Sequence, residues 1–197
     1  MHPKQRPLNC SKFADQLGLK NLAKTLPAFE GAPIRVRFLP ELRAGRDKLY
    51  SRRPYGQPVY AASFIRRRSI VLDEELARKR RELARIVVHE LFHFAWVRLG
   101  NRLRDSYMDL LREERKAHVR GELGWSAESR KQRLHEAVGR ARREKRWRDY
   151  ACESFCDTAA WMYAGIGRHP EFTLAAGHRA RRAEWFRAAF EGREIPI

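Results

Sequence analysis

The segment from Ile86 to Val97 restricts the fold more than any other part of the sequence. Apart from His89, Glu90 and His93 it contains only uncharged residues, although charged residues make up 34% of the whole chain. An uncharged run in so charged a chain is typical of a buried element. Nothing breaks the helical pattern that surrounds it over residues 73–100. We therefore predict a long buried helix that carries two histidines and a glutamate.

These three polar residues form a His-Glu-x-x-His pattern. Positions i and i+4 lie one above the other on the same face of an α-helix, so His89 and His93 can bind one metal ion. Glu90 is turned by about 100° from His89. It therefore lies beside the ion, where a general base can take a proton from a water molecule. We predict two metal ligands and a catalytic base, because unpaired polar groups in a core are costly. Two core histidines satisfied by hydrogen bonds are the structural alternative.

The third ligand is expected on a second, more apolar helix over residues 149–164. A zinc ion at a catalytic site has three protein ligands and an open position for water. Glu153 and Asp157 are four residues apart, so both point toward the same neighbouring element. We predict that Glu153 binds the metal. We further predict that Asp157 accepts the other ring N–H of a ligating histidine, which fixes the tautomer of that ring.

With His-Glu-x-x-His on one helix and a glutamate ligand on another, the chain resembles the gluzincin zinc metallopeptidases, in particular their small single-domain members. The resemblance implies one zinc ion per chain, hydrolysis of a peptide or protein substrate, and these roles: His89, His93 and Glu153 as zinc ligands, Glu90 as the catalytic residue and Asp157 as a partner of a ligating histidine. It also implies that an edge strand holds the extended substrate, either residues 69–72 or their neighbours at 59–65. The order of elements matches over residues 34–164, and only the two helices match in detail.

Three features depart from the gluzincin pattern. Glu153 lies 153 − 93 = 60 residues after His93, a long gap that we interpret as a basic helical insertion or lid over residues 101–149. Cys152 stands just before the glutamate ligand, where the family often has a polar residue. The residue that would stabilise the developing oxyanion is not assigned. The candidates are Tyr150, Tyr163, His169 and His178.

The order of the elements predicts an α+β fold, in which a small N-terminal mixed or antiparallel β-sheet is followed by a mainly helical, zincin-like core. Strands are expected at 34–39, 59–65 and 69–72, with a loop at 43–58. Further helices are expected at 11–24, through most of 101–149 with Ser126 as one cap, and at 178–190. We assign residues 1–33 to a lead-in segment and residues 34–197 to a single domain.

Basic residues dominate the charge of the chain. Its 42 Lys and Arg against 24 Asp and Glu give a net charge of +18, which favours contact with nucleic acid, anionic lipid or acidic protein. Charge runs of this kind usually coat solvated helices, and nucleic-acid binding through the arginine-rich residues 102–148 is the alternative. No zinc-finger, leucine-zipper or helix-turn-helix pattern accompanies them. Nucleic acid therefore stays an open partner.

Three cysteines, Cys10, Cys152 and Cys156, are too few and odd in number for a disulfide framework, which favours a reducing compartment. No run approaches the ~20 apolar residues of a membrane span. Residues 1–21 lack the apolar stretch of a secretory signal. We therefore expect a cytoplasmic protein without a membrane partner.

The cysteines also allow a rival assignment. Cys152 and Cys156 have i, i+4 spacing, as have His89 and His93, so the four can form a closed structural zinc site. That assignment leaves the acidic residues of both helices without a role. Such a chain would be a nucleic-acid-associated protein with a structural His₂Cys₂ zinc or a degenerate site. Cys10 is a further candidate, as an outside cap on the zinc that keeps the enzyme inactive.

Overall fold

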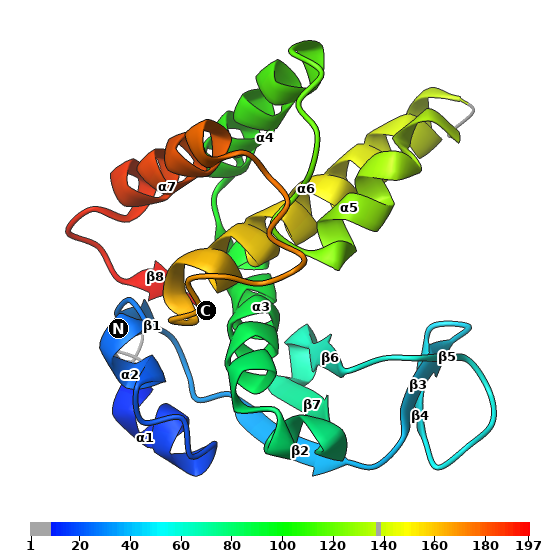
Figure 1. Ribbon diagram of the computed structural model, residues 1–197, viewed down its shortest axis with the longest axis vertical. Helices are drawn as coiled ribbons and strands as arrows, with labels where there is room; N and C mark the ends of the chain where they lie inside the picture. The colour runs from blue at the N-terminus through cyan, green and yellow to red at the C-terminus, as the bar shows by residue number, and fades with distance from the viewer. Residues whose placement is uncertain (1–8, 137–138) are drawn as a thin grey trace, which may run out of the picture.

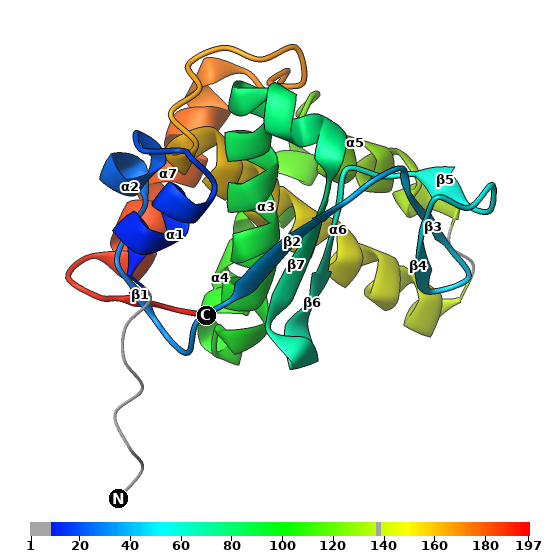
Figure 2. The ribbon, with the colours of Figure 1, turned by 90° about the horizontal axis from the view of Figure 1, so that it is seen from below.

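In the computed structural model, a three-stranded β-sheet lies against the long helix α3 (Arg80–Arg98) (Figure 1 and Figure 2). The structure describes residues 9–136 and 139–197. Strands β2 (Arg35–Leu39) and β7 (Ser69–Asp73) run parallel, and β6 (Ala61–Phe64) pairs antiparallel with β7. A mixed sheet combined with a mainly helical remainder confirms the predicted α+β fold.

β7 is the central strand of this sheet, in the order β2-β7-β6. Its residues from Ser69 to Leu72 are all buried, as in a strand that is covered on both faces. A central strand has both rows of backbone groups paired, so the prediction of residues 69–72 as an edge strand is wrong. The edge on the side of α5 and α6 belongs to β6, within the alternative range 59–65 (Figure 1).

A second, smaller sheet occupies the stretch that we predicted as a loop over 43–58. Strands β3 (Leu42–Gly45), β4 (Lys48–Ser51) and β5 (Gln57–Pro58) form it, antiparallel and in the order β4-β3-β5. The turn between β3 and β4 has positive φ at both central residues, 48° and 58° for the pair Arg46–Asp47. This is the backbone of a type I′ hairpin. The usual sequence of this turn is Asn-Gly. Because the chain has Arg-Asp there, the sequence did not predict a hairpin.

The described part of the lead-in segment belongs to the same core as the rest of the fold. Strand β1 (Phe29–Glu30) pairs in parallel with β8 (Ile195–Pro196). Phe13 and Phe29 are 3% and 1% exposed and pack in the core that α3 also joins. The segment from 9 to 33 therefore packs into the same core as the rest of the described chain.

Helices make up most of the described chain, and three of them depart from prediction. The helix predicted over 11–24 is broken at Gly18, where φ is 63°. The helix predicted over 73–100 starts as a 3₁₀ turn and is interrupted at Lys79. Gly124 is the N-cap of α5, so the prediction of Ser126 as a cap is wrong. The further bounds are α1 (Cys10–Gln16), α2 (Leu22–Thr25), η1 (Ile65–Arg67), η2 (Glu74–Arg78), α4 (Asn101–Lys116), α5 (Trp125–Gln132), η3 (Leu134–Glu136), α6 (Arg140–Tyr163) and α7 (Ala176–Phe190).

Helices α3, α6 and α7 form the centre of the core. Phe92 on α3 contacts Phe155 on α6 with ring centroids 5.8 Å apart, and Phe155 stacks on Phe186 of α7 at 4.8 Å. Most of the segment from Ile86 to Val97 is buried in this packing, as predicted. Within the described ranges, no helix combines the length and the apolar character needed to cross a membrane.

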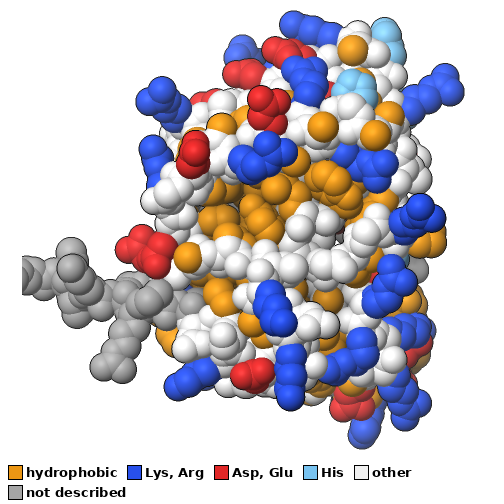
Figure 3. Space-filling view, turned by 60° about the vertical axis from the view of Figure 1, so that its left-hand side comes forward, with side chains coloured by type: hydrophobic (Ala, Val, Ile, Leu, Met, Phe, Trp, Pro, Cys, Tyr) orange, Lys and Arg blue, Asp and Glu red, His pale blue; other side chains and the backbone are white. Residues whose placement is uncertain are grey.

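Positive charge is distributed over the surface. On the face in Figure 3, Lys and Arg side chains surround an apolar hollow, with Asp and Glu between them. The predicted basic insertion over 101–149 forms α4, α5 and the first turns of α6, where Arg142 and Arg143 are exposed. The arginines there coat helices, and α5 also reaches the site described next.

Candidate metal centre

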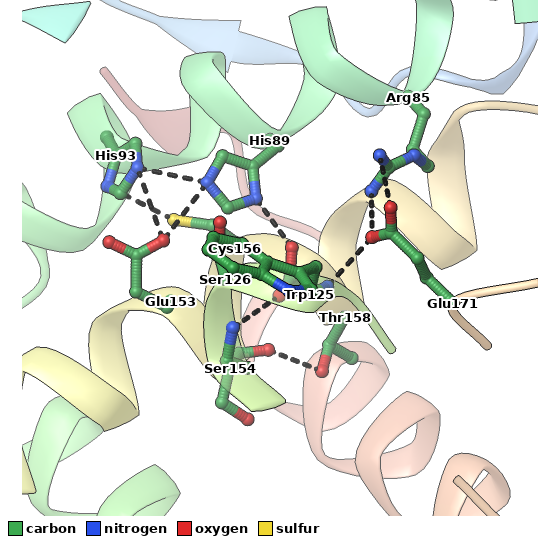
Figure 4. Close-up of polar contacts among 12 residues, drawn as sticks. Arg85, His89, His93, Trp125, Ser126, Glu153, Ser154, Cys156, Thr158 and Glu171 are labelled. Atoms are coloured by element: carbon green, nitrogen blue, oxygen red, sulfur yellow. Dashed lines mark hydrogen bonds and ion pairs between the residues drawn. The ribbon is translucent and has the colours of Figure 1, made fainter. Parts of the chain in front are cut away.

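Helices α3 and α6 bring the three predicted ligands together (Figure 4). The Nε2 atoms of His89 and His93 are 3.2 Å apart. Oε2 of Glu153 lies 3.3 Å from Nε2 of His89 and 4.0 Å from Nε2 of His93. Ligand atoms bound at ~2.0–2.1 Å to a tetrahedral ion are about 3.3 Å apart. The three side chains therefore have the spacing of one metal site and can hold a metal ion.

Asp157 holds His89 in the orientation that this site requires. Its Oδ1 accepts a hydrogen bond from Nδ1 of His89 at 2.7 Å, which leaves Nε2 to face the other ligands. Its Oδ2 accepts the backbone N–H of Ala127 at 3.0 Å. The structure thus places Asp157 in contact with one of the two predicted ligand histidines, and that histidine is His89.

The approach of α5 to Asp157 depends on Gly124. A methyl group at this position would lie 2.2 Å from Cγ of Asp157, well inside van der Waals contact. Only glycine at position 124 therefore lets the first turn of α5 come close enough for the backbone N–H of Ala127 to donate to the carboxylate of Asp157. The sequence does not indicate this role of Gly124.

Glu90 lies beside the ligands and is bound to the sheet. Its Oε2 accepts a hydrogen bond of 2.6 Å from the hydroxyl of Ser63 on β6. The Ser63 oxygen is also 3.0 Å from the carbonyl oxygen of Glu90. Sequence reasoning missed Ser63, because a serine within a strand carries no distinguishing pattern. The contact orients the predicted base.

An open cleft of about 410 Å³ gives access to the three ligands and Glu90. It lies between β6 and α5. Two exposed apolar side chains line it, Val97 (45% exposed) and Trp125 (68% exposed). A cleft of this size falls in the range of ligand-binding pockets. The candidate metal site is thus open to a substrate on one side.

Positive groups surround Glu153. Nη2 of Arg130 on α5 lies 2.9 Å from Oε1, the carboxylate oxygen that does not face the histidines. Burial raises the pKa of Glu153, but the hydrogen bond from His89 and the charges of His93 and Arg130 outweigh burial, and the pKa falls to about 2. The carboxylate is therefore ionised at neutral pH, which is the form that binds a metal.

Both histidines are more basic than usual. Burial opposes protonation of His89, but the carboxylate of Asp157 outweighs it and holds the pKa well above the ordinary value. Burial likewise opposes protonation of His93, and the hydrogen bond with Cys152 raises its pKa to about 9. A metal ion must therefore displace protons when it binds these rings.

Cys152 and Cys156 contact the other nitrogen of His93. Each Sγ lies 3.4 Å from Nδ1 of His93, whereas His89 and Glu153 face Nε2. The hydrogen bond between the thiols lowers the pKa of Cys152 to about 6, and burial raises the pKa of Cys156 well above its usual value. Of the four residues of the rival His₂Cys₂ site, Cys152 and Cys156 thus lie at Nδ1 of His93, whereas His89 lies at Nε2 on the other side of the ring.

None of the four oxyanion candidates lines the cleft. The hydroxyl of Tyr150 donates to a buried carboxylate, Tyr163 stacks on a core phenylalanine, His169 pairs with a carboxylate, and His178 lies on α7. Cys10, the candidate zinc cap, bonds to a backbone carbonyl and belongs to none of the possible metal groups within the described residues.

Helix α5 supplies three cleft residues that sequence reasoning missed: Trp125, Ser126 and Arg130. The start of this helix is fixed by Glu171, whose Oε2 accepts the Trp125 N–H at 2.8 Å. Arg85 on α3 in turn binds Glu171 at 3.0 Å. These residues lie in the segment that we predicted as an insertion, and no local pattern connects them to the site.

A separate group, Glu82, His169 and Glu171, also has donor atoms close enough for a metal ion. The guanidinium of Arg85 binds both of its carboxylates. Since the guanidinium of Arg85 already lies against both carboxylates, we interpret the group as an ion-pair network.

Comparison of the chain with known protein families, with curated proteins and with solved structures finds no match.

Proposed function

We propose that the chain is a zinc-dependent metallopeptidase of the gluzincin type, which hydrolyses peptide bonds in a peptide or protein substrate. The observation that carries the proposal is the convergence of His89, His93 and Glu153 on one point, with Glu90 beside them in an open cleft. Two core histidines held only by hydrogen bonds would need neither a third donor atom at ligand spacing nor a cleft.

Zinc suits this donor set. Two imidazoles and one carboxylate, with one position open, are a usual ligand set of catalytic zinc. His89, His93 and Glu153 would hold one ion per chain. When bound, zinc supplies Lewis acidity, which polarises a carbonyl group and makes water more acidic.

Glu90 is the base and acid of the proposed reaction. Its carboxylate accepts a proton from the attacking water and donates that proton to the nitrogen of the leaving amine. Glu90 is ionised again at the end, so one water is consumed for each peptide bond. The hydroxyl of Ser63 holds one oxygen of the carboxylate in place throughout.

The substrate is proposed to bind as an added strand along β6. Within the described residues β6 pairs with β7 on one side, which leaves the groups of its other edge available to an extended peptide. Val97 and Trp125 then contact side chains of the bound segment across the cleft. The enzyme should therefore prefer unfolded or loop segments.

The deciding experiment measures zinc content and hydrolysis on the same preparations. The parent protein should contain about one zinc by atomic emission and should cleave members of a quenched fluorescent peptide library. Glu90→Gln should retain the zinc and lose hydrolysis. Glu153→Ala should lose both. Glu113→Gln, an exposed change on α4, is the matched control and should behave as the parent.

Two results would contradict this proposal. Hydrolysis by Glu90→Gln at the parent rate would exclude Glu90 as the base. Loss of zinc in a Cys152→Ala/Cys156→Ala variant together with full retention in Glu153→Ala would make the metal structural.

A second candidate function, nucleic-acid binding, is favoured by a separate groove. This groove of about 1010 Å³ is lined by residues of α1 and β2. Strand β2 is the edge of the sheet opposite to β6 (Figure 2). It is lined by five basic side chains and no acidic one: Lys12, Arg35, Arg37, Arg66 and Arg67. Such a lining suits a phosphate backbone. This location differs from the helices at 102–148 that the sequence indicated.

The salt dependence of nucleic-acid binding shows whether the groove or the basic helices contact the phosphates. Anisotropy of a labelled single-stranded oligonucleotide should show binding that weakens steeply with salt. Arg35→Ala/Arg37→Ala should reduce the slope against salt by about 2, one for each lost phosphate contact. Arg142→Ala/Arg143→Ala on α6 should leave the slope unchanged. The reverse pattern would assign binding to α6, and a flat response would remove this function.

A further inference from the structure

We propose that Cys152, Cys156 and Nδ1 of His93 form a second metal site, which takes a soft, thiophilic cation and competes with the first site for the ring of His93. Both sites thus lie around one imidazole, one at each nitrogen.

The three donor atoms already have suitable spacing. Each Sγ is 3.4 Å from Nδ1 of His93, and the three atoms all lie within 4.8 Å of one another. A tetrahedral ion with a metal–sulfur bond of ~2.3 Å and a metal–nitrogen bond of ~2.0 Å separates these atoms by about 3.5 Å. Small rotations of the side chains would therefore accommodate the ion.

The thiol pair is arranged for a cation and poorly arranged for a disulfide. Cys152 and Cys156 lie one helical turn apart on the face of α6 that meets α3. Cβ atoms at this spacing are ~5–6 Å apart, whereas a disulfide requires about 3.5–4.5 Å. A metal ion bridges the larger gap without distortion of the helix.

The donor set selects the class of cation. Two thiolates and one imidazole favour soft d¹⁰ ions such as Cu⁺ and Cd²⁺, while the carboxylate of Glu153 gives the first site a harder character. Cys156 is fully buried and Cys152 is half-buried, so the ion would enter past Cys152. Burial also protects the bound ion from water.

Competition follows from the chemistry of the shared ring. A neutral imidazole has one nitrogen lone pair available for a metal and one N–H. Binding through Nδ1 places the proton of His93 on Nε2, the atom that faces His89 and Glu153. The first site then loses one of its three ligands. This step rests on the proposed function, whereas the thiophilic site itself does not.

Cadmium is the probe for the test. Addition of Cd²⁺ to the metal-free parent should produce the ultraviolet thiolate-to-cadmium absorption band, with about one Cd²⁺ bound through sulfur per chain. Glu153→Ala lacks the first site and should keep the band. Cys152→Ser/Cys156→Ser should lose it, and Cys10→Ser, which changes the remaining thiol of the chain, should keep it. Far-ultraviolet circular dichroism checks that each variant is folded.

The second part of the cadmium test starts from parent protein loaded with one Zn²⁺ per chain. Cadmium should raise the band and release zinc to a zinc-sensitive dye in equal amounts. A missing band in both the parent and Glu153→Ala would overturn the second site. A full band with all zinc retained would overturn the competition. A band in a parent that never binds zinc would leave the thiophilic site standing and refute the proposed peptidase site.

Discussion

The hydroxyl of Ser63 on β6 donates a hydrogen bond of 2.6 Å to the carboxylate of Glu90 on α3. This contact connects β6, the strand proposed to bind the substrate, with Glu90, the residue proposed to transfer protons during hydrolysis. Under the proposed function, binding of an extended peptide to β6 would therefore act on the same element that orients Glu90.

Removal of this hydroxyl should slow turnover without loss of metal. A hydrogen bond to a charged group contributes ~1.5–3 kcal/mol, so Ser63→Ala should lower kcat by about 10- to 100-fold. KM and zinc content should stay near the parent values. Ser63→Thr keeps the hydroxyl and should recover most of the rate. Equal kcat in Ser63→Ala and the parent would show that Glu90 needs no such support.

Asp157 should determine how tightly zinc is held. The partner of a ligating histidine usually accounts for about 10- to 100-fold in metal affinity. Asp157→Asn should weaken zinc binding by that factor, measured by competition with a chelator. Asp109→Asn, a change on the exposed side of α4, is the control and should have no effect. Unchanged affinity in Asp157→Asn would mean that the orientation of His89 is set elsewhere.

A single methyl group at Gly124 should disturb both stability and metal binding. It would lie 2.2 Å from Cγ of Asp157, so α5 or the carboxylate must shift. Gly124→Ala should lower the free energy of unfolding by about 1–3 kcal/mol and weaken zinc binding. Gly177→Ala in α7 meets no atom within 4 Å and should keep or raise the melting temperature. Similar melting curves for the two variants would contradict the proposed contact.

The buried ion cluster around Arg182 should make the fold sensitive to acid. Arg182 lies 2.7 Å from both Glu114 and Glu122. Burial raises the pKa of Glu122, but Arg182 outweighs burial and the pKa of Glu122 in the folded protein lies below its ordinary value. The unfolded chain therefore binds protons more readily. The stability from Glu122 is present above about pH 4.3 and is lost as the pH falls toward the folded pKa.

Urea unfolding at a series of pH values tests this dependence. Glu122→Gln should be less stable than the parent at neutral pH, because it leaves Arg182 with one less charge partner. Below about pH 4.3 the difference between the two proteins should shrink. Parallel stability curves from pH 7 down to acid unfolding would show that Glu122 is not the group responsible.

The sequence was most informative where one helix carries the whole pattern. The run from Ile86 to Val97 predicted a buried helix and placed His89 and His93 on one face, and the structure contains both features. Glu153 and Asp157 were found by the same helical spacing on a second helix. Periodicity within one helix is local, so it can be read directly from the residues.

Contacts between elements were beyond such reasoning. Ser63, Trp125 and Arg130 reach the cleft because β6 packs on α3 and α5 packs on α6. Similarly, the hairpin turn at Arg46 takes a left-handed backbone that favours Asn or Gly, and the composition there indicated a loop. Tertiary packing decided these features, and it leaves no local pattern in the sequence.

The parallel pairing of β1 with β8 has a consequence for the order of folding. Phe29 pairs with Ile195, 195 − 29 = 166 positions later in the chain. Closure of so long a loop is slow compared with the short-range pairing of β6 with β7. We expect the sheet and α3 to assemble early and the β1–β8 pair to form late. The pairing of the N-terminal layer with the last strand would then be the final part of the fold to form.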